Sequence, residues 1–194
     1  GARNVAVIPN GVSTGFEVYS QNKLLAMKNQ FSIQKNVRNF CFMGRLVKAK
    51  GVQDVIEALN ADEVLYVIGT GDYKQELMKL AKDKNKAVVF LGEQDKMFFM
   101  NFFTLMDAFI NPSYAEGLPT SILEAGVAGC PVIATDVGGT KEVVTKNTGW
   151  LVRPKHLRAA MTVVSKARVK AMAALIEKKF EWRVIRESFI EQVS

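Results

Sequence analysis

Short apolar runs alternate with helix-length segments along most of this 194-residue chain. Runs of strand length lie at residues 39–43, 63–68, 87–91, 107–111, 131–134 and 149–152. Apolar runs without polar alternation are typical of strands that are buried on both faces. Strict alternation of strands and helices is typical of a parallel sheet with crossover helices. The sequence therefore predicts an α/β fold in which a parallel sheet lies between two layers of helices.

The segments between the runs have the helical period. Residues 51–60, for example, place Val52, Val55, Ile56 and Leu59 on one face. Further helices are predicted at 73–85, 96–104, 119–128 and 140–145.

The chain divides into three parts by regularity. Residues 36–152 contain the alternating pattern and are predicted to form the main domain. Residues 1–35 are predicted to be an irregular approach segment, with a short strand at 5–8 and a turn at Pro9-Asn-Gly. Residues 153–194 are predicted to be amphipathic helices that close the fold.

Cysteine usage and hydropathy exclude several classes of protein. Cys41 and Cys130 lie inside apolar runs, which indicates buried thiols rather than a disulfide or a metal site. No apolar stretch is long enough to cross a bilayer, and we see no signal peptide. A cytoplasmic location is therefore expected.

The net charge of +7 is unevenly distributed, because basic residues outnumber acidic ones between Lys155 and Arg186. The simplest explanation is the solvated face of helices. The alternatives are contact with an anionic membrane surface, which would place the protein peripherally on the inner membrane face, or a polyanionic or phosphate-rich ligand. No motif for binding nucleic acid is present.

Ligands of open parallel sheets bind beyond the carboxyl ends of the strands, so the loops there are candidate site walls. Arg45 and Lys50 flank one such loop, which leads from Gly44 to Gly51. A planar guanidinium and a compact ammonium beside free backbone N–H groups suit a diphosphate. The alternative is two exposed cations on a surface loop. Gly69-Thr-Gly71 lacks the third glycine of a dinucleotide fingerprint, and a strand-end turn explains both glycines.

A second candidate wall precedes the helix that Pro119 is expected to start. The N–H groups of Thr120 and Ser121 would be unpaired there and could bind phosphate, and Gly117 would allow close approach. Glu116 and Glu124 bracket this position and could accept hydrogen bonds from neutral hydroxyls on either side of a diphosphate. Such a ligand is a nucleotide sugar. The alternative makes Glu116 a partner of the helix dipole and Glu124 a surface residue.

The segment from Glu116 to Glu124 resembles the two-glutamate motif of the retaining glycosyltransferases of family 4, which have the GT-B fold. Ile8-Pro-Asn-Gly-Val12 resembles the family's entry to its C-terminal domain, although Ser13 stands where Asp is usual. The phosphate-loop-like segment 44–51 and the segments 67–71, 89–92, 131–139 and 149–152 follow in the family's order. The resemblance implies the C-terminal half of a GT-B glycosyltransferase, with a Rossmann-like nucleotide-sugar-binding domain at residues 36–152.

The resemblance also implies roles for single residues. Arg45 and Lys50 would hold the donor diphosphate, and Glu116 would contact the transferred sugar; these three form the expected catalytic set. Glu124 would bind the ribose hydroxyls. The other residues of the expected donor site are Gly44, Gly71, Leu91, Gly92, Gly117, Leu118, Thr120 and Ser121. No metal or other cofactor is expected, because Arg and Lys would offset the charge of the leaving diphosphate.

The expected partner is a missing N-terminal, acceptor-binding domain, so the isolated chain is expected to be inactive. The acceptor would be a glycan or a lipid-linked molecule. Trp182 resembles the family's terminal-helix signature and is expected to be a packing residue. The main alternative is a non-catalytic nucleotide-sugar-binding subunit or regulatory domain, and a related GT-B phosphorylase or epimerase also stays open. A nicotinamide-dependent dehydrogenase is disfavoured, because its three-glycine fingerprint is absent.

Overall fold

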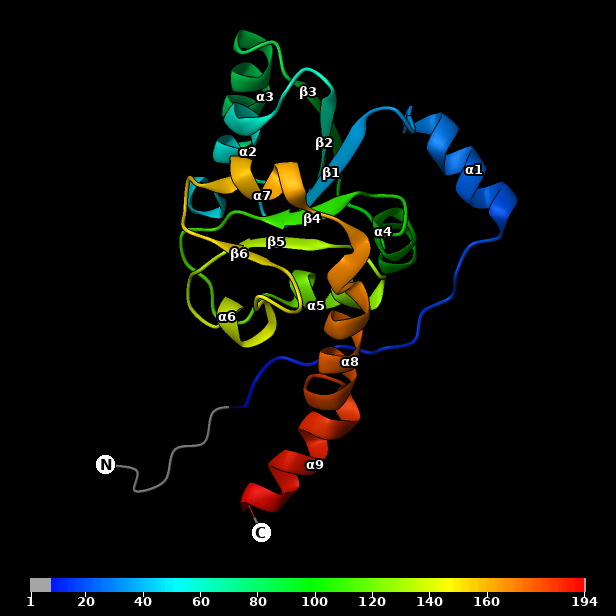
Figure 1. Ribbon diagram of the computed structural model, residues 1–194, viewed down its shortest axis with the longest axis vertical. Coiled ribbons are helices and arrows are strands. Elements are labelled where there is room, and N and C mark those ends of the chain that lie inside the picture. Colours follow the sequence, from blue (N-terminus) through cyan, green and yellow to red (C-terminus); the bar gives the residue numbers. More distant parts are fainter. Residues whose placement is uncertain (1–7, 194) are drawn as a thin grey trace.

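A six-stranded parallel sheet lies between two layers of helices in the computed structural model, which describes residues 8–193 (Figure 1). This confirms the expected three-layer, Rossmann-like fold. The strands are β1 (Arg38–Met43), β2 (Glu63–Ile68), β3 (Ala87–Gly92), β4 (Ala108–Asn111), β5 (Val132–Thr135) and β6 (Trp150–Val152). The helices are α1 (Gln21–Gln30), α2 (Val52–Ala58), α3 (Lys74–Asp83), α4 (Lys96–Phe103), α5 (Thr120–Val127), α6 (Thr140–Val143), α7 (Leu157–Val163), α8 (Val169–Lys179) and α9 (Trp182–Val193), with 3₁₀ turns η1 (Lys48–Lys50) and η2 (Lys166–Arg168).

Both faces of the sheet are buried, which explains the continuous apolar runs. Phe40 and Phe42 of β1 point into the core under α2, α3 and α7, whereas Cys41 between them points into the core under α4, α5 and α8. Cys41 and Cys130 are free buried thiols, as the sequence predicted.

The strand order is β3-β2-β1-β4-β5-β6. The chain therefore proceeds outward from β1 to β3, crosses back, and proceeds outward on the other side from β4 to β6. The central pair β1 and β4 is parallel, with Phe40 opposite Ala108. The loops that follow these two strands meet at the carboxyl edge, where the strand order reverses and where open α/β sheets bind their ligands.

The approach segment differs from its prediction by one helix. α1 begins after Ser20, whose hydroxyl accepts a hydrogen bond from the Lys23 N–H at 3.4 Å. Met27 is the buried residue of this helix, so its sequence lacks the apolar stripe by which a helix is recognised. Residues 5–7 of the strand predicted at 5–8 lie outside the described residues.

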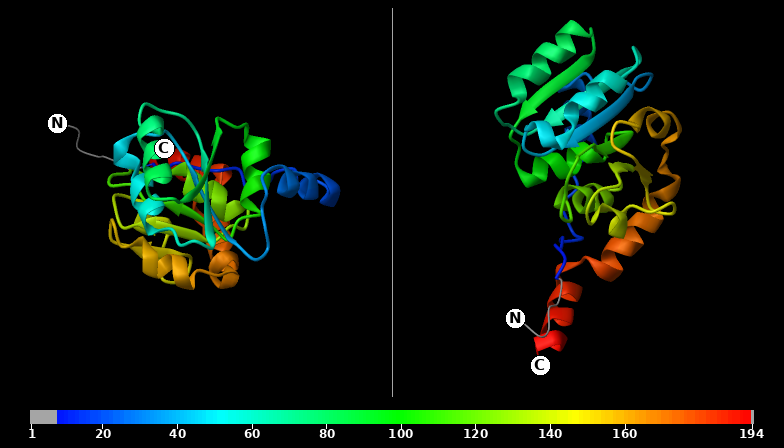
Figure 2. Two further views of the ribbon diagram at one scale, coloured as in Figure 1. Left: turned by 90° about the horizontal axis from the view of Figure 1, so that it is seen from above. Right: turned by 90° about the vertical axis from the view of Figure 1, so that its left-hand side faces the viewer.

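The predicted closing helices are α7, α8 and α9. α9 projects away from the body of the molecule, beyond the end of α8 (Figure 2). The N-terminal segment passes the junction of these two helices, where Val12 forms an isolated parallel bridge with Glu181. In the described part of the chain, no helix is long and apolar enough to cross a membrane.

Candidate functional site

Two loops lie side by side at the carboxyl edge of β1 and β4. The Tyr114 N–H donates to the Ala49 carbonyl at 2.9 Å, which joins the loop after β4 to the loop after β1. Gly51 is left-handed (φ 70°), and a Cβ there would lie 2.1 Å from the Pro112 carbonyl oxygen. Only glycine therefore permits this close approach of the two backbones.

A cleft of about 520 Å³ opens between these loops and the start of α5. Eight of the residues expected to bind the donor line it together, although they come from two distant parts of the sequence. They are Gly44, Arg45, Lys50, Glu116, Gly117, Leu118, Thr120 and Ser121.

The Glu116 carboxylate is fixed on one side. Its Oε1 accepts hydrogen bonds from the Lys50 ammonium at 2.5 Å and from the Ser113 hydroxyl at 2.6 Å. Ser113 is fully buried, and the exposed fraction of the Glu116 side chain is 10%. Oε2 has no hydrogen-bond partner among the described residues, so it is free to accept a hydrogen bond from a ligand hydroxyl.

The N-terminus of α5 supplies two free donors. Pro119 precedes the helix as its N-cap, one residue earlier than the first-turn position predicted from the sequence. Within residues 8–193, the N–H groups of Thr120 and Ser121 have no backbone acceptor, whereas the Ile122 N–H donates to the Pro119 carbonyl at 3.2 Å. These donors and the helix dipole favour an anion in the cleft.

A third loop braces the Glu116 loop from behind. The Gly139 N–H donates to the Gly117 carbonyl at 2.8 Å. Gly138 is left-handed (φ 52°), and a Cβ there would lie 1.8 Å from the Glu116 carbonyl oxygen. The glycine pair after β5 therefore sets the position of the Glu116 backbone.

Glu124 lies one turn inside α5 and is half-buried, which does not fit a solvated surface residue. Burial raises the pKa of its carboxyl group, and the charge of Lys96 at the start of α4 partly offsets this. The structure shows no hydrogen bond to its side chain from any described residue. Glu124 does not line the cleft itself but lies beyond it, toward α4.

The sequence profile of the family described as "Glycosyl transferases group 1" matches residues 25–182. The chain belongs to this family. A GDP-mannose-dependent monoacylated alpha-(1-6)-phosphatidylinositol monomannoside mannosyltransferase of Corynebacterium glutamicum is 30% identical over 172 residues, which cover 74% of this chain and 43% of that protein.

Solved structures share this fold. Anabaena Alr3699/HepE, crystallised with UDP and glucose, superposes with a TM-score of 0.86 at 21% identity, over 97% of this chain and 56% of that one. The C-terminal domain of LpcC from Francisella tularensis superposes with a TM-score of 0.72 at 23% identity, over 89% of this chain and all of that one. The chain thus spans about half the length of HepE and of the Corynebacterium protein.

Besides Glu124, three expected donor-site residues of this group 1 chain lie outside the cleft lining: Gly71, Leu91 and Gly92. A Cβ on Gly71 would lie 2.3 Å from the Leu46 carbonyl oxygen, so this glycine supports the loop after β1 from behind. Leu91 and Gly92 end β3 at the sheet edge, and the Gly92 carbonyl accepts the Gly69 N–H at 2.7 Å. They lie along the same carboxyl edge, two strands away from the cleft.

Two cleft contacts had no predicted role. Asn10 lines the cleft, and its side-chain amide donates to the Leu118 carbonyl at 2.8 Å. Its Pro-Asn-Gly context predicts only a local turn. The hydrogen bond could not be predicted from it, because Leu118 lies 108 positions away in the sequence. Ser113 bounds the predicted loop, but its hydrogen bond to Glu116 depends on the loop conformation.

Proposed function

We propose that this chain is the donor-binding domain of a retaining glycosyltransferase of family 4, in the C-terminal half of a GT-B enzyme. The donor would be a nucleoside-diphosphate sugar, and a hexosyl unit would pass to a glycan or a lipid-linked acceptor. The observation that carries the proposal is the cleft at the point where the strand order reverses, which combines two cations, a fixed carboxylate and two free helix N–H groups.

The diphosphate would lie between the cations and the start of α5. Arg45 offers a planar fork, Lys50 a compact charge, and the Thr120 and Ser121 N–H groups two neutral donors. Charge develops on the diphosphate as the glycosidic bond breaks, and fixed donors and cations stabilise it. We therefore propose that the reaction requires no metal ion.

The two glutamates would hold the groups on either side of the diphosphate. The free Oε2 of Glu116 is placed to accept a hydrogen bond from the transferred sugar. The half-buried carboxylate of Glu124 would gain its missing hydrogen bonds from the ribose hydroxyls. The base would lie toward Leu91 and Gly92, beyond the ribose.

The relatives support a nucleotide sugar as the ligand. HepE has been crystallised with UDP and with UDP-glucose, and the Corynebacterium relative is named a GDP-mannose-dependent enzyme. The mannosyltransferase name of the Corynebacterium relative favours the proposal over a non-catalytic binding subunit. The ligands named for these two relatives, UDP-glucose and GDP-mannose, differ in both base and sugar. The proposal therefore names the class of donor, a nucleoside-diphosphate sugar, and not one base or sugar.

The acceptor would bind to the other half of the enzyme, because this chain spans about half the length of its relatives. Transfer requires donor and acceptor to be held with their reacting atoms close together. We expect this chain alone to bind donor and to transfer no sugar.

The test is calorimetric titration of the chain with UDP-glucose, GDP-mannose and ADP-glucose. Arg45→Ala should weaken binding of the preferred donor by roughly 1.5–3 kcal/mol, the range for hydrogen bonds to charged groups. Lys82→Ala on α3 removes an exposed cation that does not line the cleft and should leave the affinity unchanged. Equal affinities for wild type and Arg45→Ala would contradict the proposed diphosphate site.

The roles of the glutamates are separated by two ligands, the nucleoside diphosphate and the intact donor. Glu124→Gln should weaken both, because both carry the ribose. Glu116→Gln should weaken only the donor, because the free diphosphate lacks the sugar. If Glu116→Gln weakens both ligands equally, the assignment of Glu116 to the sugar is wrong.

A further inference from the structure

The segment Asn10–Val12 touches two distant parts of the molecule with consecutive residues. Asn10 donates its side-chain amide to the Leu118 carbonyl at 2.8 Å, in the loop that leads into α5. Asn10 and Leu118 both line the cleft. The first contact of the segment is therefore with the proposed donor loop.

The next two residues contact the junction of α8 and α9. Gly11 lies against the Trp182 indole, because a Cβ at Gly11 would lie 2.6 Å from ring atom Cδ2. The Val12 N–H donates to the Phe180 carbonyl at 2.8 Å, and the Trp182 N–H donates to the Val12 carbonyl at 3.2 Å. The two backbone hydrogen bonds of Val12 thus hold this segment to the junction of α8 and α9, next to the Gly11–Trp182 contact.

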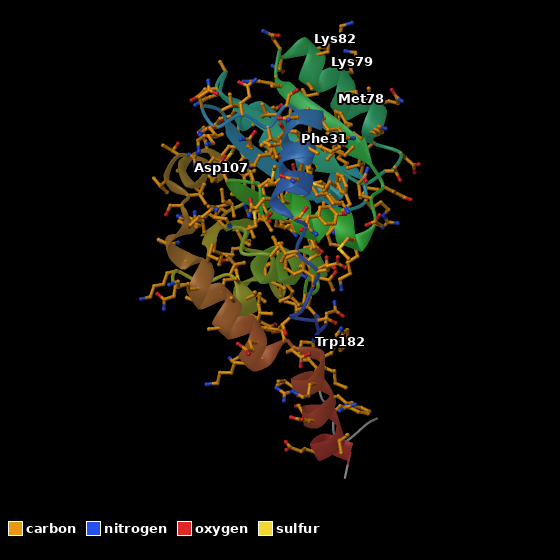
Figure 3. The ribbon with its side chains drawn as sticks, turned by 90° about the vertical axis from the view of Figure 1, so that its right-hand side faces the viewer. Phe31, Met78, Lys79, Lys82, Asp107 and Trp182 are labelled. Carbon is orange, nitrogen blue, oxygen red and sulfur yellow. The ribbon has the colours of Figure 1, made fainter. Side chains whose placement is uncertain are left out.

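The two residues that meet at the α8–α9 junction, Val12 and Trp182, differ in burial. Val12 is 4% exposed and belongs to the main core, whereas Trp182 is 51% exposed at the root of the projecting helix (Figure 3). Because the Trp182 indole is half-exposed, its environment can change without disturbing the core. If the Leu118 carbonyl moves, Asn10 is expected to move with it. Gly11 and Val12, which follow Asn10 in the chain and contact Trp182, would then shift the surroundings of the indole.

We infer that Asn10 is a positioning residue, which holds the Leu118 loop in its binding conformation and couples the cleft to α9 through the Gly11–Trp182 contact. This inference rests on the proposed function, because its ligand is the nucleotide sugar. Coupling of this kind is reciprocal: if a ligand in the cleft alters the surroundings of Trp182, a change at Trp182 alters the affinity of the cleft.

Trp182 provides the readout. The sequence contains two tryptophans, and Trp150 on β6 stacks on Arg168, so Trp150→Phe leaves Trp182 as the single fluorophore. The Trp150→Phe variant is titrated with UDP-glucose, GDP-mannose and ADP-glucose while the Trp182 fluorescence is recorded. Each titration is repeated by calorimetry. We expect the Trp182 emission to change with the same midpoint as the heat of binding.

Three substitutions in the Trp150→Phe chain test the connection. Asn10→Leu keeps a similar shape but removes the donor, and should abolish the emission change and weaken binding about threefold to tenfold, as for the loss of one hydrogen bond. Gly11→Ala displaces the indole without entering the cleft, and should also weaken binding. Asn36→Leu, in an exposed turn at the opposite edge of the sheet, should change neither.

The outcomes separate this inference from the proposed function. Calorimetric binding with a constant Trp182 emission overturns the coupling and leaves the donor site intact. Wild-type affinity in both Asn10→Leu and Gly11→Ala, with thermal unfolding showing both folded, overturns it as well. Absence of binding for all three donors overturns the proposed function and the coupling together.

Discussion

At the scale of single residues, Glu124 has an unfavourable environment in the free chain. Its carboxylate is half-buried, and Lys96 offsets the cost of burial only through its charge. Buried polar groups without hydrogen bonds cost stability, and binding sites accept this cost where a ligand supplies the missing donors. The ribose hydroxyls of the proposed donor would be such donors.

A pH dependence follows from this burial. The pKa of Glu124 is raised in the folded chain, so its contribution to stability is fully present below the ordinary glutamate pKa and is lost as pH rises through the raised value. Glu124→Gln removes this loss and should be as stable as wild type or more stable at pH 7, with no gain at low pH. Urea unfolding at several pH values measures this. A variant clearly less stable than wild type at pH 7 would show that the carboxylate has a stabilising partner.

The residues of the cleft could be predicted where chemistry and position agree. Arg45, Lys50 and Glu116 follow strand ends, and the parallel sheet brings those ends together. Asn10 and Ser113 could not be assigned roles, because their hydrogen bonds depend on how the loops fold against one another. The ion pair between Lys50 and Glu116 was also not predicted, since the sequence assigned these residues to different parts of the ligand.

At the scale of elements, one ion pair ties α7 to the sheet. Arg158 Nη1 and Nη2 donate to the two carboxylate oxygens of Glu63 at 2.5 and 2.7 Å. The exposed fraction of the Glu63 side chain is 3%, and that of Arg158 is 35%. Burial by itself would raise the pKa of Glu63, but hydrogen bonds from Arg158 and the Asn60 N–H outweigh it and lower the pKa.

Removing the arginine should therefore destabilise the whole fold. Arg158→Met keeps the aliphatic stem but leaves a buried carboxylate without its main partner, and should cost about 2–3 kcal/mol, below the full range for buried pairs because Arg158 is partly exposed. Since the pKa of Glu63 is lowered in the folded chain, the stabilisation is present at neutral pH and is lost as pH falls through that lowered value.

Urea unfolding of both proteins between pH 3 and pH 7 checks this prediction. The gap between wild type and Arg158→Met should narrow as the solution becomes acidic. Arg153→Met, just before α7, is a suitable control, because no described residue forms an ion pair with Arg153 and little change is expected. A gap that stays constant over the pH range would mean that the arginine acts by packing alone.

The elements themselves were predicted to different degrees. β2 lies at the predicted residues. Its run of six residues suits a buried strand and is too short for a typical helix, so the pattern was not ambiguous. α1 was missed because it buries so little of its surface. The strand order was not predicted, because the order depends on which side of β1 each crossover passes and the residues of the strands do not record it.

At the scale of the whole molecule, exposed cations gather along the closing helices. Arg158 and Arg168 are engaged with Glu63 and the Gly149 carbonyl, but other basic side chains of this segment are exposed. The exposed ones include Lys166, Lys170, Lys178, Lys179, Arg183 and Arg186. We propose that this surface contacts anionic lipid, which would place the protein at the membrane periphery.

Co-sedimentation with vesicles tests this surface. Each lysine or arginine near an anionic membrane contributes about 1 kcal/mol, so the chain should bind vesicles containing anionic lipid at low salt and dissociate at high salt. Replacing both Lys178 and Lys179 by Glu should weaken binding strongly, whereas the same change at Lys82 and Lys84 on the far side of the sheet should matter less. Equal binding to anionic and neutral vesicles would show that these cations only solvate the helices.

In its ion pair with Lys50, Glu116 supplies the cleft with a counterion from within the protein. An anion that binds Lys50 must compete with the Glu116 carboxylate, which is already in contact with the ammonium, and not only with water. Inorganic phosphate could bind the Lys50 ammonium, but the Glu116 carboxylate would then lose its cation in a nearly buried position. A nucleotide sugar would offer its diphosphate to Lys50 and its hydroxyls to Glu116 in the same event. The pair should therefore favour a ligand that carries both chemical groups over a simple anion such as phosphate.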